Sequence, residues 1–227
     1  MKVPAGRRRP LLWASERTAL EMGYGVVAGL DEVGMGPLAG PVVAGAVVLP
    51  AGARLPGIGD SKALTELQRG RLDLAIRRRA VSVSVCSVPA SEIDRVGLTL
   101  ARRQAMLGAL QGLCVSPEYL LIDAFDLPES PLPQLAVVKG DSTCISIMAA
   151  SIVAKVFRDR AMVEYDRIYP GYGFASHKGY ATPFHRAALR RLGPSPIHRM
   201  SWTPIRQAVA LLEAAAAAAE PASITSR

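Results

Sequence analysis

The sequence has few cysteines and no long apolar segment. Its three cysteines, Cys86, Cys114 and Cys144, show no CxxC spacing and no nearby histidine pair. An odd number of cysteines without such a framework argues against structural zinc and favours a reducing compartment. No run of about 18 apolar residues occurs, and no apolar stretch of signal-peptide length follows the basic start. We therefore expect a cytoplasmic protein with no membrane partner.

Common nucleotide-binding and hydrolase motifs are also missing. Gly34 and Gly36 do not begin a GxGxxG fingerprint, because Ala39 stands where the third glycine would be, and no P-loop is present. The histidines at positions 177, 185 and 198 lack a metal spacing, and no Ser–His–Asp or Cys–His arrangement is suggested. His185 on a predicted helix is more typical of a packing or surface residue than of a general base.

Positive charge is concentrated in two parts of this 227-residue chain, whose net charge is +8. Residues 1–24 hold five basic and two acidic groups, residues 139–206 hold eleven and four, and residues 25–138 hold ten and eleven. Two basic blocks favour a polyanionic partner, either nucleic acid or an acidic membrane surface. Many soluble proteins are simply basic, so charge alone leaves both interpretations open.

The hydrophobic pattern predicts an α/β protein. Strands are expected at residues 25–31, 41–49, 81–88, 119–122 and 135–138. Helices are expected at residues 65–79, 91–113, 142–160, 183–192 and 204–219. Ser91 and Asp94 resemble a capping box that starts the second helix. This order suits a mixed sheet flanked by helices. Residues 1–24 form a basic extension, and the alanine-rich residues 213–227 are expected to be a disordered tail.

Acidic residues stand at the ends of three predicted strands, as Asp31-Glu32, Asp123 and Asp141. A sheet can bring such residues to one edge, where clustered carboxylates repel one another unless a cation neutralises them. Oxygen-only ligands select Mg²⁺ or Mn²⁺, and two such ions about 4 Å apart can activate water against a phosphodiester. The alternative is that these acids are ordinary turn residues.

The glycine-rich segment Gly34-Met35-Gly36 decides whether the side chains of Asp31 and Glu32 can point into one site. Adjacent strand residues point to opposite sides, so Asp31 and Glu32 can share a site only if the strand ends between them. The two glycines favour such an ending and let the backbone approach a ligand closely. Taken alone, the segment is typical of a hairpin turn.

Basic and aromatic side chains near these glycines and acids suggest phosphate and base contacts. Each of these residues could hold a phosphate, although each alone is typical of a solvated surface charge: Lys62, Lys139, Lys155, Arg158, Lys178 and Arg199. Tyr169, Tyr172, Phe174 and Tyr180 interleave with residues 177–178, which resembles a stacking surface beside phosphate contacts.

Together these segments resemble the bacterial type 2 ribonuclease H family, ribonuclease HII. The matching blocks run in the family's order from residue 24 to residue 206: Ala28-Gly-Leu-Asp-Glu-Val-Gly-Met-Gly-Pro-Leu-Ala-Gly-Pro-Val, Gly59-Asp-Ser-Lys, Leu121-Ile-Asp, Val138-Lys-Gly-Asp, Ala149-Ala-Ser-Ile-Val-Ala-Lys, Arg158-Asp-Arg, Tyr172-Gly-Phe, His177-Lys-Gly-Tyr and Ile197-His-Arg. The resemblance implies a ribonuclease H-like catalytic domain over residues 25–212, with a five-stranded mixed sheet and a helical C-terminal portion.

The resemblance also implies an activity. Asp31, Glu32, Asp123 and Asp141 would be the catalytic, metal-binding carboxylates, with two Mn²⁺ or Mg²⁺ ions when substrate is bound. The enzyme would hydrolyse the RNA of RNA–DNA hybrids. It would also cut 5′ of single ribonucleotides in duplex DNA, leaving 3′-hydroxyl and 5′-phosphate ends, and we expect it to act as a monomer.

Substrate contacts follow from the same resemblance. The glycine loop would recognise the 2′-hydroxyl at the RNA–DNA junction, mainly through its backbone, and the ring of Tyr180 would pack on the adjacent deoxyribose. The expected substrate-binding residues are Gly34, Met35, Gly36, Lys62, Lys155, Arg158, Lys178, Tyr180 and Arg199. The family's loop usually has Gly-Arg-Gly, so Met35 predicts weaker substrate binding or an altered junction preference. Ala124, where glycine is common, is a minor departure.

Three other functions fit parts of the sequence. One is a DNA-directed nuclease on the same fold, and another is a catalytically impaired hybrid-binding protein. Four retained carboxylates argue against a pure binding module, because negative charge near phosphate would only weaken binding. A small-molecule phosphatase fits poorly with the basic blocks and the interleaved aromatic residues.

Overall fold

The computed structural model describes residues 13–219, which divide into two compact units. Unit 1 consists of the described residues up to Val33, together with Val43–Ser87 and Arg102–Phe157. Unit 2 consists of Gly34–Val42, Val88–Ala101 and the described residues from Arg158 onward. The predicted basic extension and alanine-rich tail lie partly outside the described residues, at 1–12 and 220–227, and the predicted boundaries at 24 and 212 stay predictions.

The sheet has five strands in the order β3-β2-β1-β4-β5. They are β1 (Val27–Val33), β2 (Val42–Val48), β3 (Ser82–Val88), β4 (Tyr119–Asp123) and β5 (Gln134–Val137). β1 is antiparallel to β2 and parallel to β4, which is parallel to β5. All five predicted strands are therefore confirmed, as is the mixed sheet.

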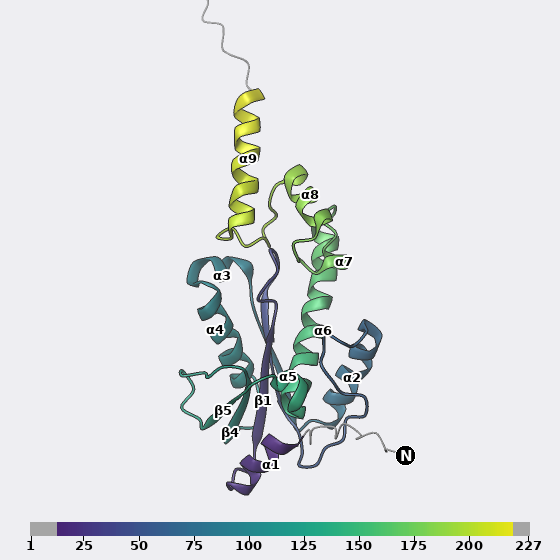
Figure 1. Ribbon diagram of the computed structural model, residues 1–227, viewed down its shortest axis with the longest axis vertical. Coiled ribbons are helices and arrows are strands. Elements are labelled where there is room, and N and C mark those ends of the chain that lie inside the picture. The colour runs from purple at the N-terminus through teal and green to yellow at the C-terminus, as the bar shows by residue number, and fades with distance from the viewer. Residues whose placement is uncertain (1–12, 220–227) are drawn as a thin grey trace, which may run out of the picture. The chain divides into compact units, whose positions relative to one another are not determined.

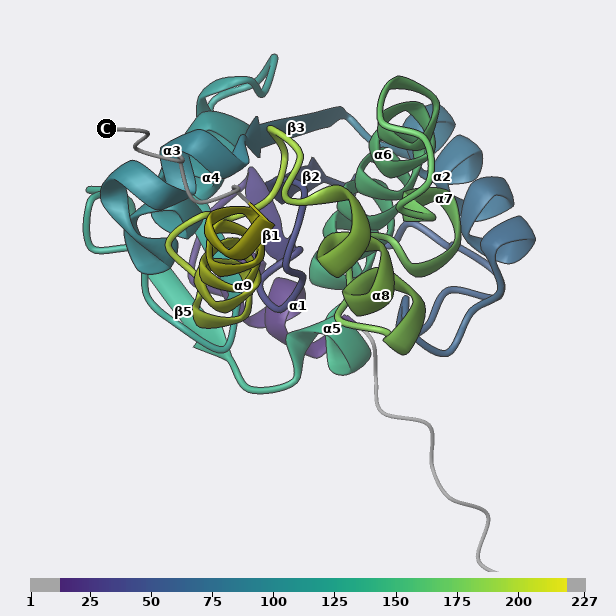
Figure 2. The same ribbon diagram turned by 90° about the horizontal axis from the view of Figure 1, so that it is seen from above.

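Helices cover both faces of this sheet in unit 1. Figure 2 shows α4 (Leu98–Gln111) on one side of β1 and both α2 (Glu66–Arg79) and α6 (Ile145–Ile168) on the other. Side chains of β3 point alternately to the two faces of the sheet, so this one strand packs against helices on both sides. Val83 and Val85 pack on the cluster formed with α2 and α6, whereas Cys86 points at Gly108 of α4.

Two glycines let α6 lie directly on the sheet. A Cβ atom at Gly29 would stand 2.2 Å from the carbonyl carbon of Ser146, and one at Gly45 would stand 2.5 Å from the carbonyl oxygen of Ala150. No side chain other than hydrogen fits at either position. Since Gly45 pairs with Asp31 across β1 and β2, this contact brings the next residue of α6, Ser151, beside Asp31.

The short helix α1 (Ala14–Glu21) was not predicted and lies within the expected N-terminal extension. It packs against β1 and β4. Its Glu16 is buried, and one carboxylate oxygen accepts hydrogen bonds from the Ser146 amide (2.9 Å), the Ser146 hydroxyl (2.7 Å) and the Cys144 thiol (3.0 Å). This part of the extension is therefore joined to the start of α6.

The single helix predicted at residues 91–113 is wrong. Gly97, with φ of +84°, separates α3 (Ala90–Val96) from α4, because a left-handed residue cannot continue a helix. The predicted capping box is also wrong, since Pro89 is the N-cap of α3. Asp94 instead accepts hydrogen bonds from the backbone amides of Met200 (2.7 Å) and Ser201 (2.9 Å) within unit 2.

The remaining helices agree more closely with expectation. The segment predicted as one helix at 142–160 is α5 (Gly140–Thr143) followed by α6, with an extended residue, Cys144, between them. Unit 2 also holds α7 (Phe174–His177), α8 (Pro183–Leu192) and α9 (Thr203–Ala219), which includes residues 213–219 of the predicted tail (Figure 1). None of the helices within residues 13–219 is both long and apolar enough to cross a membrane.

Candidate active site

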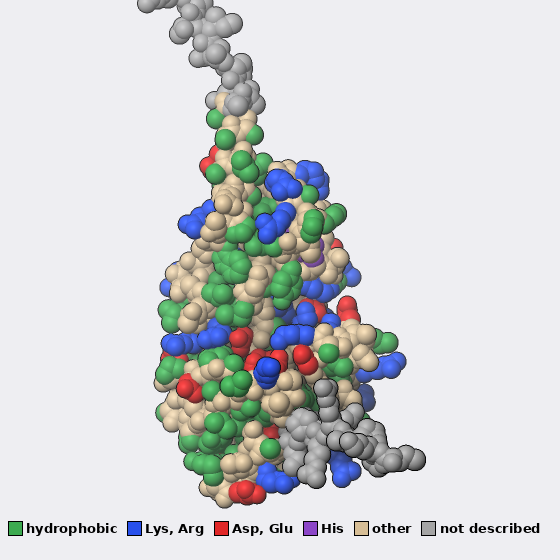
Figure 3. Space-filling view, viewed as in Figure 1, with side chains coloured by type: hydrophobic (Ala, Val, Ile, Leu, Met, Phe, Trp, Pro, Cys, Tyr) green, Lys and Arg blue, Asp and Glu red, His purple; other side chains and the backbone are tan. Residues whose placement is uncertain are grey.

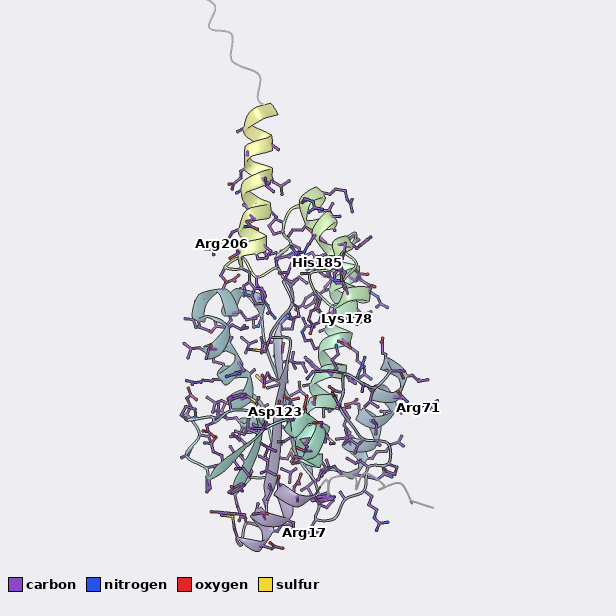
Figure 4. The ribbon with its side chains drawn as sticks, in the orientation of Figure 1. Arg17, Arg71, Asp123, Lys178, His185 and Arg206 are labelled. Carbon is purple, nitrogen blue, oxygen red and sulfur yellow. The ribbon has the colours of Figure 1, made fainter. Side chains whose placement is uncertain are left out.

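The four predicted carboxylates all belong to unit 1, at the ends of the central strands. Asp31 lies on β1, and Asp123 is the last residue of the parallel neighbour β4 (Figure 4). Asp141 lies in α5, directly after β5, and its backbone amide donates to Asp123 Oδ1 at 3.3 Å. In Figure 3, acidic side chains gather with basic ones among them near the level of α5. Asp123 and Asp141 are thus in direct contact, and the predicted roles of the four acids stay predictions.

Asp31 and Glu32 reach this region from opposite faces of one continuous strand. The prediction that the strand ends between them is wrong, because β1 continues to Val33. Asp31 is buried and bonds to Ser151 of α6, while Glu32 Oε1 lies 3.8 Å from Arg102 Nη1 of α4. Both acids are still near enough to Asp123 for its negative charge to raise their pKa values.

Burial and the negative charge of neighbouring acids raise the pKa values of three carboxyl groups in this cluster. Burial raises the pKa of Asp31 well above its ordinary value, and the negative charge of Glu32 raises it further. Burial raises the pKa of Glu32 too, although Arg102 opposes the shift. The pKa of Asp123 is raised by burial and then by the charge of Asp141. A bound cation would remove each of these costs.

The segment at residues 60–62 is linked to two of the acids, through the predicted Lys62 and through Ser61, which sequence reasoning missed. Lys62 Nζ donates to Asp141 Oδ2 at 2.9 Å, and this bond raises the pKa of Lys62. The preceding Ser61 is buried, and its hydroxyl lies 2.9 Å from that of Ser151, which bonds Asp31. The signal for Ser61 was its place in the Gly-Asp-Ser-Lys block.

Arg102 and Phe125 are further residues that the sequence did not single out. The Arg102 guanidinium lies over the Phe125 ring, 3.6 Å from its centroid, while facing Glu32. This cation–π contact holds a positive charge beside Glu32. No local pattern in α4 distinguishes Arg102 from Arg103, so only the fold identifies it.

The donor set suits a hard divalent cation. All four groups offer oxygen, and the Oε2 atom of Glu32 is buried without a hydrogen-bond partner. In the described part of the chain, no three Asp, Glu, His or Cys side chains are close enough to hold an ion as they stand. A cation binding here would therefore have to draw the carboxylates together.

The glycine loop belongs to unit 2 and follows β1 after Val33. Gly34 has φ of +91°, and a Cβ atom there would lie 2.5 Å from both Arg158 Nε and the Pro41 carbonyl oxygen. Gly36 is exposed, and a Cβ atom added there would have Cε1 of Tyr180 as its nearest neighbour, at 3.7 Å. Folding of unit 2 thus explains the glycine at 34 but not the one at 36.

The basic residues predicted to bind substrate differ in exposure. Arg158 and Arg199 are almost completely buried in unit 2 and donate to backbone carbonyls, so their placement does not support direct phosphate contacts. Burial and the charge of Arg158 lower the pKa of Arg199 to about 9, which leaves it protonated at neutral pH. Lys178 donates to the Ala175 carbonyl at 2.6 Å, and Lys155 is half-buried on α6 in unit 1.

The three histidines lie together in unit 2, which their sequence spacing did not indicate. The rings of His177 and His185 stack with centroids 4.4 Å apart, and His185 Nε2 lies 3.0 Å from His198 Nε2. The other ring nitrogen of His185 lies 2.9 Å from the carbonyl oxygen of Tyr180. The predicted packing role of His185 is consistent with its complete burial. The cluster supports the segment that presents Tyr180.

Known proteins match this arrangement over most of the chain. The family model described as Ribonuclease HII matches residues 28–205. A ribonuclease HII of Geobacter sulfurreducens is 49% identical over 88% of this chain and 92% of its own length, and one of Myxococcus xanthus is 49% identical over 91% and 71%.

Solved structures give the same result for the fold. The ribonuclease H2 of Pyrococcus horikoshii aligns with a TM-score of 0.73 and 28% identity, over 83% of this chain and 99% of that one. The ribonuclease HII from a complex with PCNA of Archaeoglobus fulgidus aligns with a TM-score of 0.66 and 27% identity, over 77% and 92%. A Mn²⁺ complex of Bst-RNase HIII shares the fold at 19% identity, with a TM-score of 0.66 over 83% of this chain and 70% of that one.

Proposed function

Because the chain belongs to the ribonuclease HII family, it is a ribonuclease H that acts on RNA–DNA hybrids, and we propose that it also cuts 5′ of single ribonucleotides in duplex DNA. The proposal rests mainly on the carboxylate cluster of unit 1. At this sheet edge the pKa values of Asp31, Glu32 and Asp123 are raised by burial and by neighbouring negative charge, and a divalent cation, the usual partner of phosphodiester hydrolysis, would relieve both effects.

In this proposal Asp31, Glu32, Asp123 and Asp141 hold Mn²⁺ or Mg²⁺, with two ions present when substrate is bound. When bound, such ions supply a nucleophilic water at neutral pH and neutralise charge on the phosphodiester. The protein holds the acids in place: Ser151 bonds Asp31, and the backbone amide of Asp141 bonds Asp123. The products are a 3′-hydroxyl and a 5′-phosphate.

Lys62 has a separate part in the proposal. Its ammonium group is exposed on a flexible side chain and bonds Asp141, whose charge a metal ion would also satisfy. A metal ion at Asp141 would free the lysine to contact a substrate phosphate, where a positive charge favours binding. Lys62 would thus exchange one anionic partner for another.

The loop and Tyr180 of unit 2 supply specificity for ribose. An amide-lined loop can distinguish RNA from DNA only through the 2′-hydroxyl or the helix shape that it dictates. The open side of Gly36 and the exposed ring of Tyr180, 47% exposed, form an apolar surface suited to a sugar. Met35 lacks the guanidinium usual in the family, so binding should be weaker than in relatives with arginine. We further propose that the enzyme is a cytoplasmic monomer.

The test is cleavage of a duplex with one embedded ribonucleotide in Mn²⁺ or Mg²⁺. Wild-type protein and the exposed-acid control Asp126→Asn should cut 5′ of the ribonucleotide, whereas Asp141→Asn should be nearly inactive. Equal cleavage of an all-DNA duplex would favour a DNA-directed nuclease. Binding without cleavage would favour a hybrid-binding protein, and cleavage that survives Asp141→Asn would contradict the proposed mechanism.

A further inference from the structure

Two arginines in unit 2 are buried without serving as surface charges. Arg158 is 1% exposed and Arg199 is 0% exposed, which makes them the largest fully buried side chains of the described residues. Burying a guanidinium is costly unless its donors are satisfied. The partners of these two side chains therefore indicate why the fold retains them.

Arg199 donates hydrogen bonds to backbone carbonyls of the glycine loop. Its Nη1 donates to the Met35 carbonyl at 3.1 Å, and its Nη2 donates to the carbonyls of Gly34 and, at 3.0 Å, Gly40. Its Nε donates to Gly40 as well, at 3.2 Å. One planar group thus fixes both ends of the segment from residue 34 to residue 40.

Arg158 donates hydrogen bonds to the C-terminal end of the same segment, at residues 39 and 41. Its Nε donates to the Pro41 carbonyl at 2.9 Å and its Nη2 to the Ala39 carbonyl at 3.2 Å. Its Nη1 donates to the carbonyl of Lys178 at 3.0 Å, two residues before Tyr180. The loop and the segment that carries Tyr180 are therefore bonded to one guanidinium.

The orientation of the loop amides follows from these bonds. A trans peptide group directs its carbonyl and its N–H in opposite directions. Since the carbonyls of Gly34 and Met35 point to Arg199, the amides of Met35 and Gly36 point away from it. Gly36 is also the exposed residue of the loop, where no side chain limits access.

We propose that Arg158 and Arg199 are positioning residues for ribose recognition, which direct the amides of Met35 and Gly36 at the 2′-oxygen of the substrate. This inference rests on the proposed function of the loop. Arginine suits the task because its five donors lie in one rigid plane, whereas the ammonium of lysine is a single point on a flexible stem. Substitution by lysine keeps the charge and removes the fork.

The experiment compares two duplexes that differ at one atom. One carries a single ribonucleotide and the other a 2′-deoxy-2′-fluoro nucleotide, whose fluorine accepts hydrogen bonds only weakly. Dissociation constants are measured in Ca²⁺, with uncut duplex verified afterwards. The ratio of the two constants is the readout, because partial unfolding or a lost phosphate contact weakens both complexes equally and leaves the ratio unchanged.

In wild-type protein the ratio should be about ten, the value of one net hydrogen bond. In Arg199→Lys it should fall towards one, while the exposed control Arg206→Lys on α9 keeps the wild-type ratio (Figure 4). If thermal melting shows that Arg199→Lys is unfolded, Arg158→Lys serves the same test.

Two results would overturn the inference, and they are distinguishable. An unchanged ratio in folded Arg199→Lys and Arg158→Lys would refute the positioning role and leave the proposed function intact. A ratio of one in the wild-type protein would show that the 2′-oxygen is not bound by hydrogen bonds, which would refute the recognition on which the inference depends.

Discussion

Gly34 and Gly36 are two residues apart, yet alanine should affect the protein in different ways at each. At Gly34 an alanine would be forced into a positive φ and placed 2.5 Å from Arg158 Nε and the Pro41 carbonyl. A non-glycine residue in such a conformation costs about 1–3 kcal/mol, to which the steric overlap adds. We expect Gly34→Ala to lose about 2–3 kcal/mol of unfolding free energy and about 7 °C in Tm.

At Gly36 the same substitution meets almost nothing in the protein. Its φ is not in the left-handed region, and the new Cβ would be in ordinary contact, 3.7 Å from Tyr180 Cε1. Replacing glycine by alanine at an unstrained position reduces the entropy of the unfolded chain, so Tm should equal or exceed that of the wild type. The methyl group would instead occupy the proposed position of the ribose, and a displacement of about 1 Å there costs about 100-fold in kcat/KM.

The assay combines thermal melting with cleavage of the single-ribonucleotide duplex for both variants. Gly36→Ala should combine a wild-type Tm with greatly reduced kcat/KM. A fully active Gly36→Ala would refute the reasoning, because the open side of the loop would then not face the substrate. A Gly36→Ala variant that melts as early as Gly34→Ala would show that the loop requires both glycines for folding.

Three further predictions concern unit 1. Lys62→Met removes an exposed ion pair to Asp141 that contributes at most about 1 kcal/mol, so Tm should stay nearly unchanged while KM for the duplex rises at least about five-fold; an unchanged KM would exclude a phosphate contact. Because the pKa of Asp31 is raised in the folded protein, stability without metal should fall as pH rises from the ordinary value of 3.8 through the raised value. Mn²⁺ at 100 times its Kd should then raise Tm by about 8 °C at pH 7 and by less at pH 5, as differential scanning fluorimetry can measure. The Asp31→Asn variant should show no such rise, and an equal rise in that variant would place the ion elsewhere. Glu16→Ala leaves the thiol of Cys144 without its carboxylate partner and should lose about 2–3 kcal/mol of unfolding free energy in denaturant titration, with faster thiol labelling; labelling at the wild-type rate would show that α1 does not protect the thiol.

Much of the sheet and the position of the acids could be predicted from the sequence. Hydrophobic runs that lead up to Asp31, Asp123 and Asp141 mark three neighbouring strands, although only Asp123 is the last residue of its strand. The pattern could not show on which face each acid lies. Asp31 and Glu32 lie on opposite faces of β1 because α6 and α4 carry their partners, which are 120 and 70 residues away in the sequence.

Local signals failed where tertiary contacts decide the outcome. Ser91 and Asp94 have the spacing of a capping box, but Asp94 bonds the amides of Met200 and Ser201, which are distant in sequence. Gly97 was read as part of one helix, since a glycine within an apolar repeat does not by itself announce a positive φ. Likewise, a charged side chain is normally exposed, and no local pattern distinguishes the buried Arg199 from a surface arginine.

The most direct test of the central claim is the chemical identity of the ends produced from a duplex with one ribonucleotide. Hydrolysis by water at a metal-bound carboxylate site predicts a 3′-hydroxyl on the preceding deoxynucleotide and a 5′-phosphate on the ribonucleotide, which mass spectrometry can identify. A 2′,3′-cyclic phosphate would mean that the ribose hydroxyl itself attacks and would contradict the proposed role of the four carboxylates. A cut on the 3′ side of the ribonucleotide would contradict the proposed position of cleavage.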